Sequence, residues 1–385
     1  MSLDFQQARQ QVRQMGESAP GRESRLRDLR QRAWDLMHLY DQELEGLRQK
    51  VQLVVRSHDP SLRCALPSSV NLTAHFPPGE LPARQLLWAA DGSQIFLDHH
   101  AAAEYFLINI GAIRMVYGDP AAPQTSIQTF LFYGDDLNIS GAYPTEDRIS
   151  LLRDLRERQR MADLAAQAGE PAITLTDGRL ELWGASPAEA AGEANEKSLD
   201  AFLEALERLE GAGATAAGYV DKPGEDYLVR LLEIASQPPE DARQRPLRGV
   251  RDVDLFRLIL APGERSAVFE TQSRAAGIYK RRKPSLTPHF FYLNVGREGH
   301  PWLARVDILA WVAADRRKLD HLHAILVHQC HMLGSRPYPY ALHRAHEIAR
   351  VTPDEKNQLD MMIANELRKQ GILVEESHKQ YLKSL

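Results

Sequence analysis

Three short apolar segments of this sequence each run directly into an aspartate, and this recurrence limits the folds open to the chain. The segments with their aspartates are Leu86–Ala90 with Asp91, Ala172–Thr176 with Asp177, and Ala214–Val220 with Asp221. A short apolar run closed by a turn residue is typical of a buried strand. A carboxylate at the end of such a strand is poorly solvated, so it needs a cation opposite it. A single Asp-Gly pair is most often a simple turn, whereas three strand ends of this kind favour a shared site.

Length and composition indicate a soluble globular protein. A chain of 385 residues can bury one large core, or one core with a substantial insertion. Its 47 Lys and Arg against 52 Asp and Glu give a net charge of −5, which shows no global basic signal for nucleic acid but allows a basic channel. Cys64 and Cys330 share no metal-ligand spacing, which favours a reduced compartment. Because the sequence has no run of about 18 apolar residues and no signal peptide, we expect a cytoplasmic protein without a membrane association.

The order of the predicted elements indicates a mixed α/β fold. In order, these are strands over Leu86–Leu97, Tyr105–Val116 and Ser126–Tyr133, a helix over Arg148–Ala168, the Asp177 strand, a helix over Ser198–Arg208, the Asp221 strand and a helix over Asp226–Ser236. The first strands predict an antiparallel beginning, and the alternation that follows predicts a mixed layer. Residues 238–284 are mostly polar and are expected to be irregular, with a short helix at Val253–Leu260, and Trp302–Val312 is a further predicted strand.

The N-terminal region predicts one long helix over Glu23–Arg56, after polar residues 1–20 that are expected to be frayed or only loosely helical. Apolar residues of this helix recur every seven positions and form one stripe. The stripe consists of Ala33, Met37, Tyr40, Leu44, Leu47, Val51 and Val54. It packs either on the helix's own domain or against a helix from a second subunit.

Aspartates at the ends of neighbouring strands would lie within a few ångströms of one another, where like charges oppose ionisation unless a cation neutralises them. Oxygen ligands without cysteine suit magnesium or manganese. Two such ions about 3.5–4 Å apart form a clamp for phosphodiester cleavage. Glu157, on the helix before Asp177, is the candidate for a further ligand. Because Arg156 and Arg158 flank it, the alternative is a surface glutamate in local ion pairs.

Two other groups of polar residues have simpler interpretations. Three histidines on a predicted helix, His321, His323 and His328, share no metal-ligand spacing with a carboxylate or cysteine, so we interpret them as structural. Four successive cations, Lys280–Lys283, form either a solvated face or a contact to phosphate.

Six motifs in order between residues 86 and 350 resemble those of the NurA nuclease family, whose members act with a HerA-type DNA translocase in DNA end resection. The motifs are Ala90-Asp91-Gly92-Ser93-Gln94, Arg153-x-x-x-Glu157, Thr176-Asp177-Gly178-x-Leu180, Gly218-Tyr219-Val220-Asp221-Lys222-Pro223, Ala304-Arg305-Val306-Asp307 and Tyr338-Pro339-Tyr340-x-Leu342-x-x-Ala345-His346. Each motif is weak alone, whereas six in this order are specific.

The resemblance implies a ribonuclease-H-like (PIWI-like) mixed-sheet core with added antiparallel barrel-like strands and flanking N- and C-terminal helices. It implies a manganese-dependent deoxyribonuclease with two ions per site, magnesium being the alternative ion. The implied activity is 5′-to-3′ exonuclease cleavage of single-stranded DNA and duplex ends, with endonuclease cleavage of single strands, in double-strand break repair. The implied domains are an N-terminal helical segment (1–57), a nuclease domain (58–350) with an insertion at 238–284, and a C-terminal helical segment (351–385).

The resemblance also assigns site residues. The implied catalytic residues are Asp91, Glu157, Asp177 and His346. The three carboxylates among them are the implied metal ligands. His346 would be a further ligand or a proton donor at the scissile phosphate, and His343, three residues earlier, competes for this role. The second-tier candidates are Asp221, Tyr338 and Arg305. Asp307 stands where the family usually has glutamate.

The implied partners are DNA, a second copy of the chain and a HerA-type hexameric ATPase. In the family a dimeric ring caps the translocase, so we expect the Glu23–Arg56 helix and the C-terminal segment to form contact surfaces. The expected phosphate-contacting residues are Lys222, Arg281, Arg282 and Lys283. One alternative is a non-catalytic ring subunit that binds and stimulates a translocase. Another is a metal-dependent phosphatase for small substrates, which lacks support because the chain has no phosphate-cradling glycine loop.

Overall fold

The strand that carries Asp91 is β3 (Gln85–Ile95), which has a neighbouring strand on each side in the computed structural model of the chain. The structure describes residues 3–97, 103–137, 144–182, 193–334 and 336–372. The chain forms two compact units, each built from separate stretches of sequence. Unit 1 consists of Met1–Pro77, Lys222–Arg274 and His289–Arg305, and unit 2 consists of Pro78–Asp221, Ala275–Pro288 and Val306–Leu385. The domain limits implied by the resemblance stay a prediction.

Unit 2 contains a mixed sheet centred on β3. On one side β3 is antiparallel to β4 (Tyr105–Tyr117), which is antiparallel to β5 (Gln124–Tyr133). On the other side β3 is parallel to β6 (Ala172–Asp177), and β6 is parallel to β7 (Thr215–Asp221). An antiparallel beginning followed by parallel strands confirms the predicted mixed α/β, ribonuclease-H-like class.

The register of the parallel strands brings two of the aspartates together. Ala90 of β3 pairs with Thr176 of β6, so the next residue in each strand, Asp91 and Asp177, lies at the same level of the sheet. Asp177 is the last residue of β6, whereas β3 continues past Asp91 to Ile95, so the expectation that this strand ends at its aspartate is wrong. Carboxyl ends of parallel strands are where α/β folds most often place their sites, and β6 ends at this level. The sheet therefore concentrates negative charge at this level.

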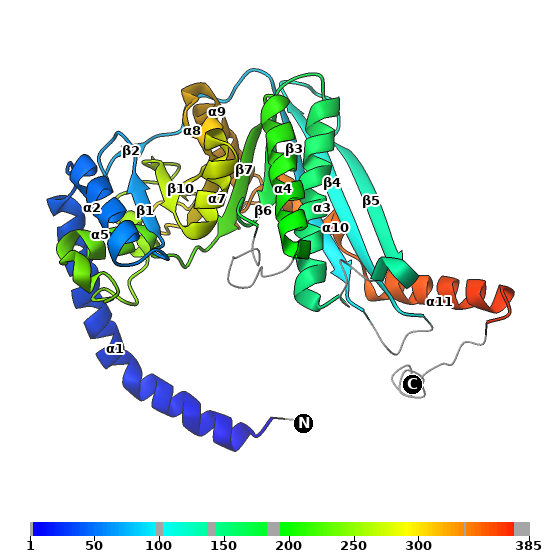
Figure 1. Cartoon of the computed structure of the whole chain (residues 1–385), viewed down its shortest axis with the longest axis horizontal. Coiled ribbons are helices and arrows are strands. Elements are labelled where there is room, and N and C mark those ends of the chain that lie inside the picture. The colour runs from blue at the N-terminus through cyan, green and yellow to red at the C-terminus, as the bar shows by residue number, and fades with distance from the viewer. Residues whose placement is uncertain (1–2, 98–102, 138–143, 183–192, 335, 373–385) are drawn as a thin grey trace. The chain divides into compact units, whose positions relative to one another are not determined.

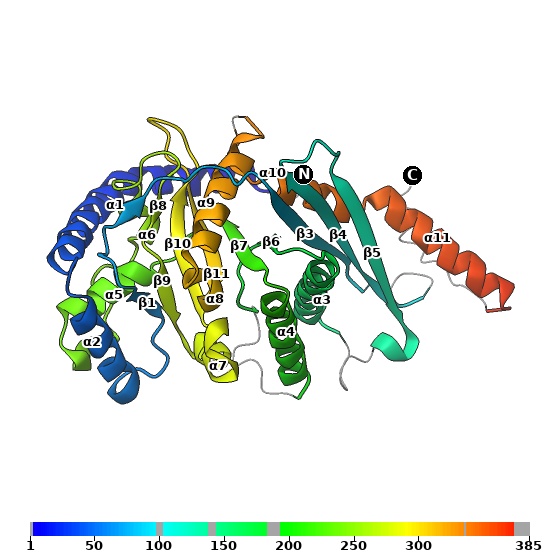
Figure 2. The ribbon, with the colours of Figure 1, turned by 90° about the horizontal axis from the view of Figure 1, so that it is seen from above.

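Helices cover both faces of this sheet. The helices α3 (Glu146–Gln167) and α4 (Glu193–Gly211) pack on one face, and α10 (Tyr340–Ala349) packs on the opposite face (Figures 1 and 2). The N-cap of α3 is Thr145, whose hydroxyl accepts a hydrogen bond from the backbone N–H of Arg148. Side chains of α3, α4 and the sheet form one apolar core between them.

Gly111 allows α10 to approach the sheet closely. It is the residue of β4 that pairs with Asp91. A Cβ atom at this position would lie 2.4 Å from the backbone nitrogen of Ala349 and 2.8 Å from the carbonyl oxygen of Ala345, both in α10. No side chain fits there without moving the helix, so α10 rests directly on the backbone beside Asp91.

The remaining elements of the later sequence partly differ from the prediction. They are η1 (Gly134–Leu137), α7 (Arg274–Arg282), η3 (Pro284–Leu286), β11 (Leu303–Leu309), α8 (Ala310–Ala313), α9 (Arg316–His331) and α11 (Pro353–Lys369). The predicted strand Trp302–Val312 is too long, because the alanine-containing end forms the helical turn α8. Among the helices of the described ranges, none combines the length and apolar character needed to cross a membrane.

Unit 1 adds antiparallel strands of its own. Its elements are α1 (Phe5–Leu39), α2 (Leu44–Ser57), β1 (Cys64–Pro67), β2 (His75–Phe76), α5 (Tyr227–Ser236), η2 (Pro239–Asp241), α6 (Asp252–Phe256), β8 (Arg265–Ser266), β9 (Phe269–Gln272) and β10 (Pro288–Asn294). The strand β9 pairs antiparallel with both β1 and β10, and β8 pairs with β10 and β2. The prediction that residues 238–284 are irregular is wrong over residues 265–272, where β8 and β9 pair with distant strands, and over α7. The short helix predicted at Val253–Leu260 is confirmed in part by α6.

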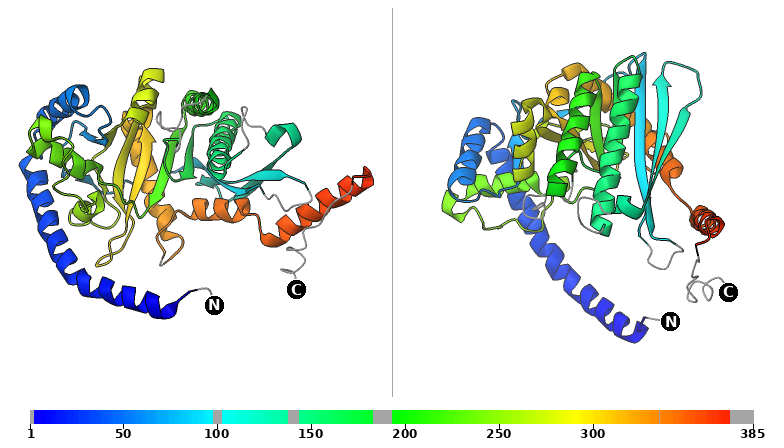
Figure 3. Two further views of the ribbon diagram at one scale, coloured as in Figure 1. Left: turned by 60° about the horizontal axis from the view of Figure 1, so that its bottom comes forward. Right: turned by 45° about the vertical axis from the view of Figure 1, so that its right-hand side comes forward.

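The N-terminal helix is longer than predicted and is followed by a second one. The predicted single helix over Glu23–Arg56 is wrong, because the chain turns after Leu39. The carboxylate of Asp41 fixes this turn by accepting hydrogen bonds from the backbone nitrogen (2.8 Å) and hydroxyl (2.9 Å) of Thr73. The helix also starts earlier, at Phe5, and its N-terminal half extends past the other elements of unit 1 (Figure 3).

The apolar stripe of α1 and α2 is buried inside unit 1. Its fully buried members are Ala33, Met37, Leu47, Val51 and Val54, and they belong to one core with residues of α5. This confirms the alternative in which the stripe packs on its own domain.

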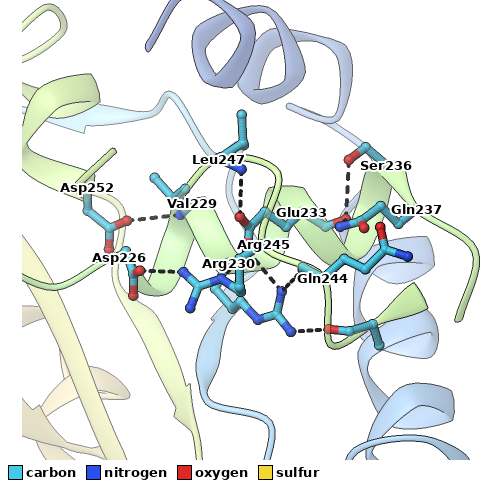
Figure 4. Close-up of polar contacts among 11 residues, drawn as sticks. Asp226, Val229, Arg230, Glu233, Ser236, Gln237, Gln244, Arg245, Leu247 and Asp252 are labelled. Carbon is cyan, nitrogen blue, oxygen red and sulfur yellow. Dashed lines mark hydrogen bonds and ion pairs between the residues drawn. The ribbon is translucent and has the colours of Figure 1, made fainter. Parts of the chain in front are cut away.

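Two acidic side chains hold the helix α5 in place, Asp252 from a later segment and Glu233 from the helix itself. Asp252 accepts hydrogen bonds from the backbone nitrogens of Leu228 and Val229, both at 2.9 Å, and therefore acts as the N-terminal cap. Figure 4 shows the contact with Val229. Farther along, the buried Glu233 forms ion pairs with Arg230 (2.9 Å) and Arg245 (2.6 Å). These contacts hold α5 and the segment that contains Arg245 and Asp252 together within unit 1.

The raised pKa of the buried Asp252 predicts that the stability of the fold depends on pH. Burial raises its pKa to about 7, against the lowering effect of its hydrogen bonds with Leu228, Val229 and Tyr292. Because the folded-state pKa lies above the unfolded-state value, the stabilisation is present at low pH and is lost as the pH rises through about 7. We expect the free energy of unfolding of the native chain, relative to Asp252→Asn, to fall between pH 5.5 and 8, by at most about 1.4 kcal/mol per pH unit. Chemical denaturation across this range measures it, and parallel pH profiles would contradict the assignment.

The close approach at Gly111 predicts a second stability effect. We expect Gly111→Ala to lower the free energy of unfolding by about 1–3 kcal/mol, because the new methyl group must displace α10. Gly79→Ala is the matched control, since a Cβ atom there has no neighbour within 4 Å among the described residues. Thermal unfolding of both variants measures the difference, and equal melting temperatures would mean that α10 does not rest on this strand.

Candidate active site

A pocket of about 540 Å³ in unit 2 lies where β3 and β6 bring their aspartates together. Its lining consists of Asp91, Gly92, Arg153, Asp154, Glu157, Arg158, Asp177, Gly178, Arg179, Glu181, Leu182, Phe202 and His346. These residues come from β3, α3, the end of β6 and the segment after it, α4 and α10. All four residues that the resemblance implies as catalytic line this pocket, and their roles stay a prediction.

Glu157 is a buried residue of this pocket and not a surface glutamate. It is 7% exposed, and it faces the sheet from α3. Burial, followed by the nearby charge of Asp91, raises the pKa of Glu157 well above its usual value. The neighbouring cations Arg158 and Arg153 oppose this rise without cancelling it. The carboxylates of Glu157 and Asp91 thus repel each other in a poorly solvated place.

The charged form of Asp177 is disfavoured for the same reasons, burial and nearby carboxylates. Burial, the charge of Asp91 and that of Asp221 raise its pKa. The hydroxyl of Tyr338 donates a hydrogen bond to the Asp177 carboxylate, and the backbone N–H of Gly178 donates another, both of which favour the charged form. Asp221 and Tyr338 therefore act on a pocket residue, although neither is part of the pocket lining.

His346 contacts the first aspartate directly. Its Nδ1 lies 2.7 Å from Oδ2 of Asp91, and Oδ1 of the same carboxylate accepts a hydrogen bond from the backbone nitrogen of Gly92 at 2.8 Å. The competing His343 lies on the same helix but contacts Glu347 at 3.6 Å, and it does not line the pocket. The geometry therefore favours His346 over His343 as the pocket histidine.

Arg305 and Asp307, the candidates from the fifth motif, are not among the pocket-lining residues. Arg305 belongs to unit 1, where its side chain is 1% exposed, lies 3.6 Å from the Glu225 carboxylate and stacks over Tyr227 and Phe290. Asp307, in unit 2, is also buried, and its Oδ2 accepts a hydrogen bond from the backbone nitrogen of Leu180 at 3.4 Å. Its contact supports the segment that follows β6.

The cations expected to bind DNA lie outside the pocket lining. Lys222, in unit 1, stacks over the ring of Trp302 at 4.4 Å. Arg282 pairs with Glu207 at 2.9 Å and Lys283 pairs with Glu210 at 2.8 Å, whereas Arg281, in the same turn of α7, reaches toward Gly277. Their role in binding DNA stays a prediction.

The other charged residues of the pocket were not predicted as site residues, although Arg153 belongs to the second motif. Arg153, Asp154 and Arg158 share one face of α3 with Glu157, because residues four apart on a helix lie one above the other. Positions 153, 154, 157 and 158 follow this spacing in the sequence, so the signal was present. Arg179 and Glu181 come from the segment after Asp177 and had no such pattern.

The donor chemistry of the pocket fits a divalent cation. In the part of the chain that the structure describes, no three Asp, Glu, His or Cys side chains are already arranged to hold a metal ion. However, Asp91, Glu157 and Asp177 offer only oxygen atoms, and Asp91 raises the pKa of the other two. Hard divalent cations such as magnesium and manganese prefer such ligands, and one would offset this repulsion.

Comparison with known proteins relates the sequence to a family. A family model described as the NurA domain matches residues 86–351. Among solved structures, the NurA nuclease from Sulfolobus solfataricus is 14% identical, with 86% of this chain and 98% of that chain covered and a TM-score of 0.47. LC9-RNase H1, a type 1 RNase H with the type 2 active-site motif, is 12% identical, with 43% and 88% covered and a TM-score of 0.23. No curated relative matches the sequence. The match over residues 86–351 spans well over half of the 385 residues and confirms the resemblance, so this chain belongs to the NurA domain family.

Proposed function

We propose that this chain is a metal-dependent nuclease that hydrolyses phosphodiester bonds of DNA. The observation that carries the proposal is the convergence of Asp91, Glu157 and Asp177 on one pocket beside His346. Carboxylates that repel one another in a buried place lower the stability of the fold, and such groups are common at sites where they bind a ligand. Membership in the NurA domain family supports the same reaction class.

The three carboxylates would hold manganese ions, with magnesium as the alternative. When bound, such ions activate water and stabilise the departing oxygen of a phosphodiester. Tyr338 fixes the orientation of the Asp177 carboxylate through its hydrogen bond. The contact between Nδ1 of His346 and Asp91 fixes the imidazole ring, so that Nε2 is the nitrogen available to a phosphate oxygen or a leaving group.

The finer features of the proposed function rest on the family alone. We propose 5′-to-3′ exonuclease cleavage of single strands and duplex ends, endonuclease cleavage of single strands, and a homodimer that acts with a HerA-type hexameric translocase in double-strand break repair. Lys222, Arg281, Arg282 and Lys283 would contact DNA phosphates in such an assembly.

The proposal predicts cleavage that depends on the carboxylates. We expect the full chain to degrade end-labelled single-stranded DNA with Mn²⁺ or Mg²⁺ and to lose this activity in EDTA. Asp91→Asn or Asp177→Asn should lower the cleavage rate about 100-fold or more, because each removes a charged ligand worth several kcal/mol. Asp200→Asn, an exposed change on α4, is the matched control. Labels at the 5′ and 3′ ends show the direction of digestion.

Two outcomes would count against this function. Cleavage that persists in EDTA and in both pocket variants would place the reaction elsewhere. No cleavage with either ion, together with stimulation of a HerA-type ATPase that survives both substitutions, would instead favour the non-catalytic ring subunit.

A further inference from the structure

Arg158 lies in the candidate pocket with much of its hydrogen-bonding capacity unused. It follows Glu157 on the face of α3 that lines the pocket, and it is only 4% exposed. Neither its Nε nor its Nη1 has a hydrogen-bond partner within the described residues. A guanidinium group is permanently charged and carries five N–H donors, so a buried one normally finds acceptors. Two of the three guanidinium nitrogens of Arg158 therefore lack an acceptor among the described residues.

The other arginine on this face of α3 differs clearly. Arg153 donates from Nη1 to Gln94 at 3.0 Å, and from Nε and Nη2 to Asp154 at 3.1 and 2.7 Å. Its donors are thus used by the protein. The contrast shows that the pocket does not leave every guanidinium group without acceptors, and that Arg158 is the exceptional one of this pair.

The ring of Phe202 holds the guanidinium group of Arg158 in place. The central carbon of this group lies 5.4 Å from the centroid of the Phe202 ring, which is itself 2% exposed. A cation over an aromatic face is stabilised electrostatically, and this contact uses none of its N–H donors. Arg158 is therefore positioned by α4 while two of its nitrogen atoms still need acceptors.

The missing acceptor should be an anion with several oxygen atoms. Guanidinium groups bind phosphates through two parallel hydrogen bonds, a geometry that suits buried anion recognition. We infer that Arg158 binds a phosphate group of the nucleic-acid strand that enters the pocket beside Glu157. The inference rests on the proposed nuclease function and assigns to the same site a residue that holds the substrate through its charge.

A neutral-linkage experiment tests this inference. Short single-stranded oligonucleotides carry one methylphosphonate in place of one phosphate linkage, and the replacement is moved along the strand. Binding is measured by fluorescence anisotropy, once in EDTA and once with Ca²⁺, for the native chain, Arg158→Met and Arg158→Lys. The matched control is Arg156→Met, because Arg156 lies on the same helix, stacks on Phe130 and does not line the pocket.

We expect one linkage at which the neutral group weakens binding to the native chain about 10-fold, as loss of a charge-assisted hydrogen bond does. Arg158→Met should bind the all-phosphate strand about 10-fold more weakly and show no further loss at that linkage. Arg158→Lys keeps the charge but not the paired donors, so its loss should be smaller. Arg156→Met should behave as the native chain. The melting temperature of Arg158→Met should be unchanged or higher, because a buried charge with two unpartnered nitrogen atoms is removed.

The outcomes separate this inference from the function on which it rests. If no linkage shows coupling to Arg158, or if Arg158→Met lowers the melting temperature and leaves binding unchanged, Arg158 is structural and the inference is overturned. Carboxylate-dependent cleavage would then still support the nuclease. Coupling without any cleavage would support phosphate binding by Arg158 and overturn the proposed reaction.

Discussion

The carboxylates of Asp91, Glu157 and Asp177 repel one another, and the fold of unit 2 must hold them together against this repulsion. Each of these groups would be better solvated elsewhere, and burial raises the pKa of both Glu157 and Asp177. The backbone hydrogen bonds of β3, β4 and β6 and the apolar core beneath α3 hold them together in spite of this cost. Polar contacts from Tyr338 and His346 then fix two of the three side chains.

Much of this arrangement follows from the sequence by simple reasoning. Apolar runs that end in aspartate predicted β3, β6 and β7, and the alternation of strands and helices predicted the mixed sheet. The end of β6 at Asp177 follows from that class of fold, whereas β3 runs past Asp91 to Ile95, so the register between the two strands is what places both aspartates at one level. Local patterns are sufficient for the end of β6, since strand ends and turns are encoded by nearby residues.

Features that depend on long-range packing could not be obtained in this way. The turn between α1 and α2 depends on a hydrogen bond from Thr73 to Asp41, and the order of residues 238–284 depends on β8 and β9 finding distant strands. Burial of Glu157 and Arg158 depends on α3 packing on the sheet, so neighbouring charges alone suggested a solvated helix. The two compact units are built from interleaved segments, which no composition shift along the chain reveals.

The contact of Gly111 with α10 has a mechanical consequence. Backbone rests on backbone there, without a layer of side chains that could yield, so strand and helix form one stiff part. His346 lies on α10, and Asp91 lies on β3 directly opposite Gly111, so both are next to this stiff part. Glu157, in contrast, reaches the pocket on a longer side chain with several rotatable bonds. In the proposed metal site, any adjustment to ions of different radius would therefore fall mainly on the Glu157 side chain, while the spacing of the histidine–aspartate pair would change less.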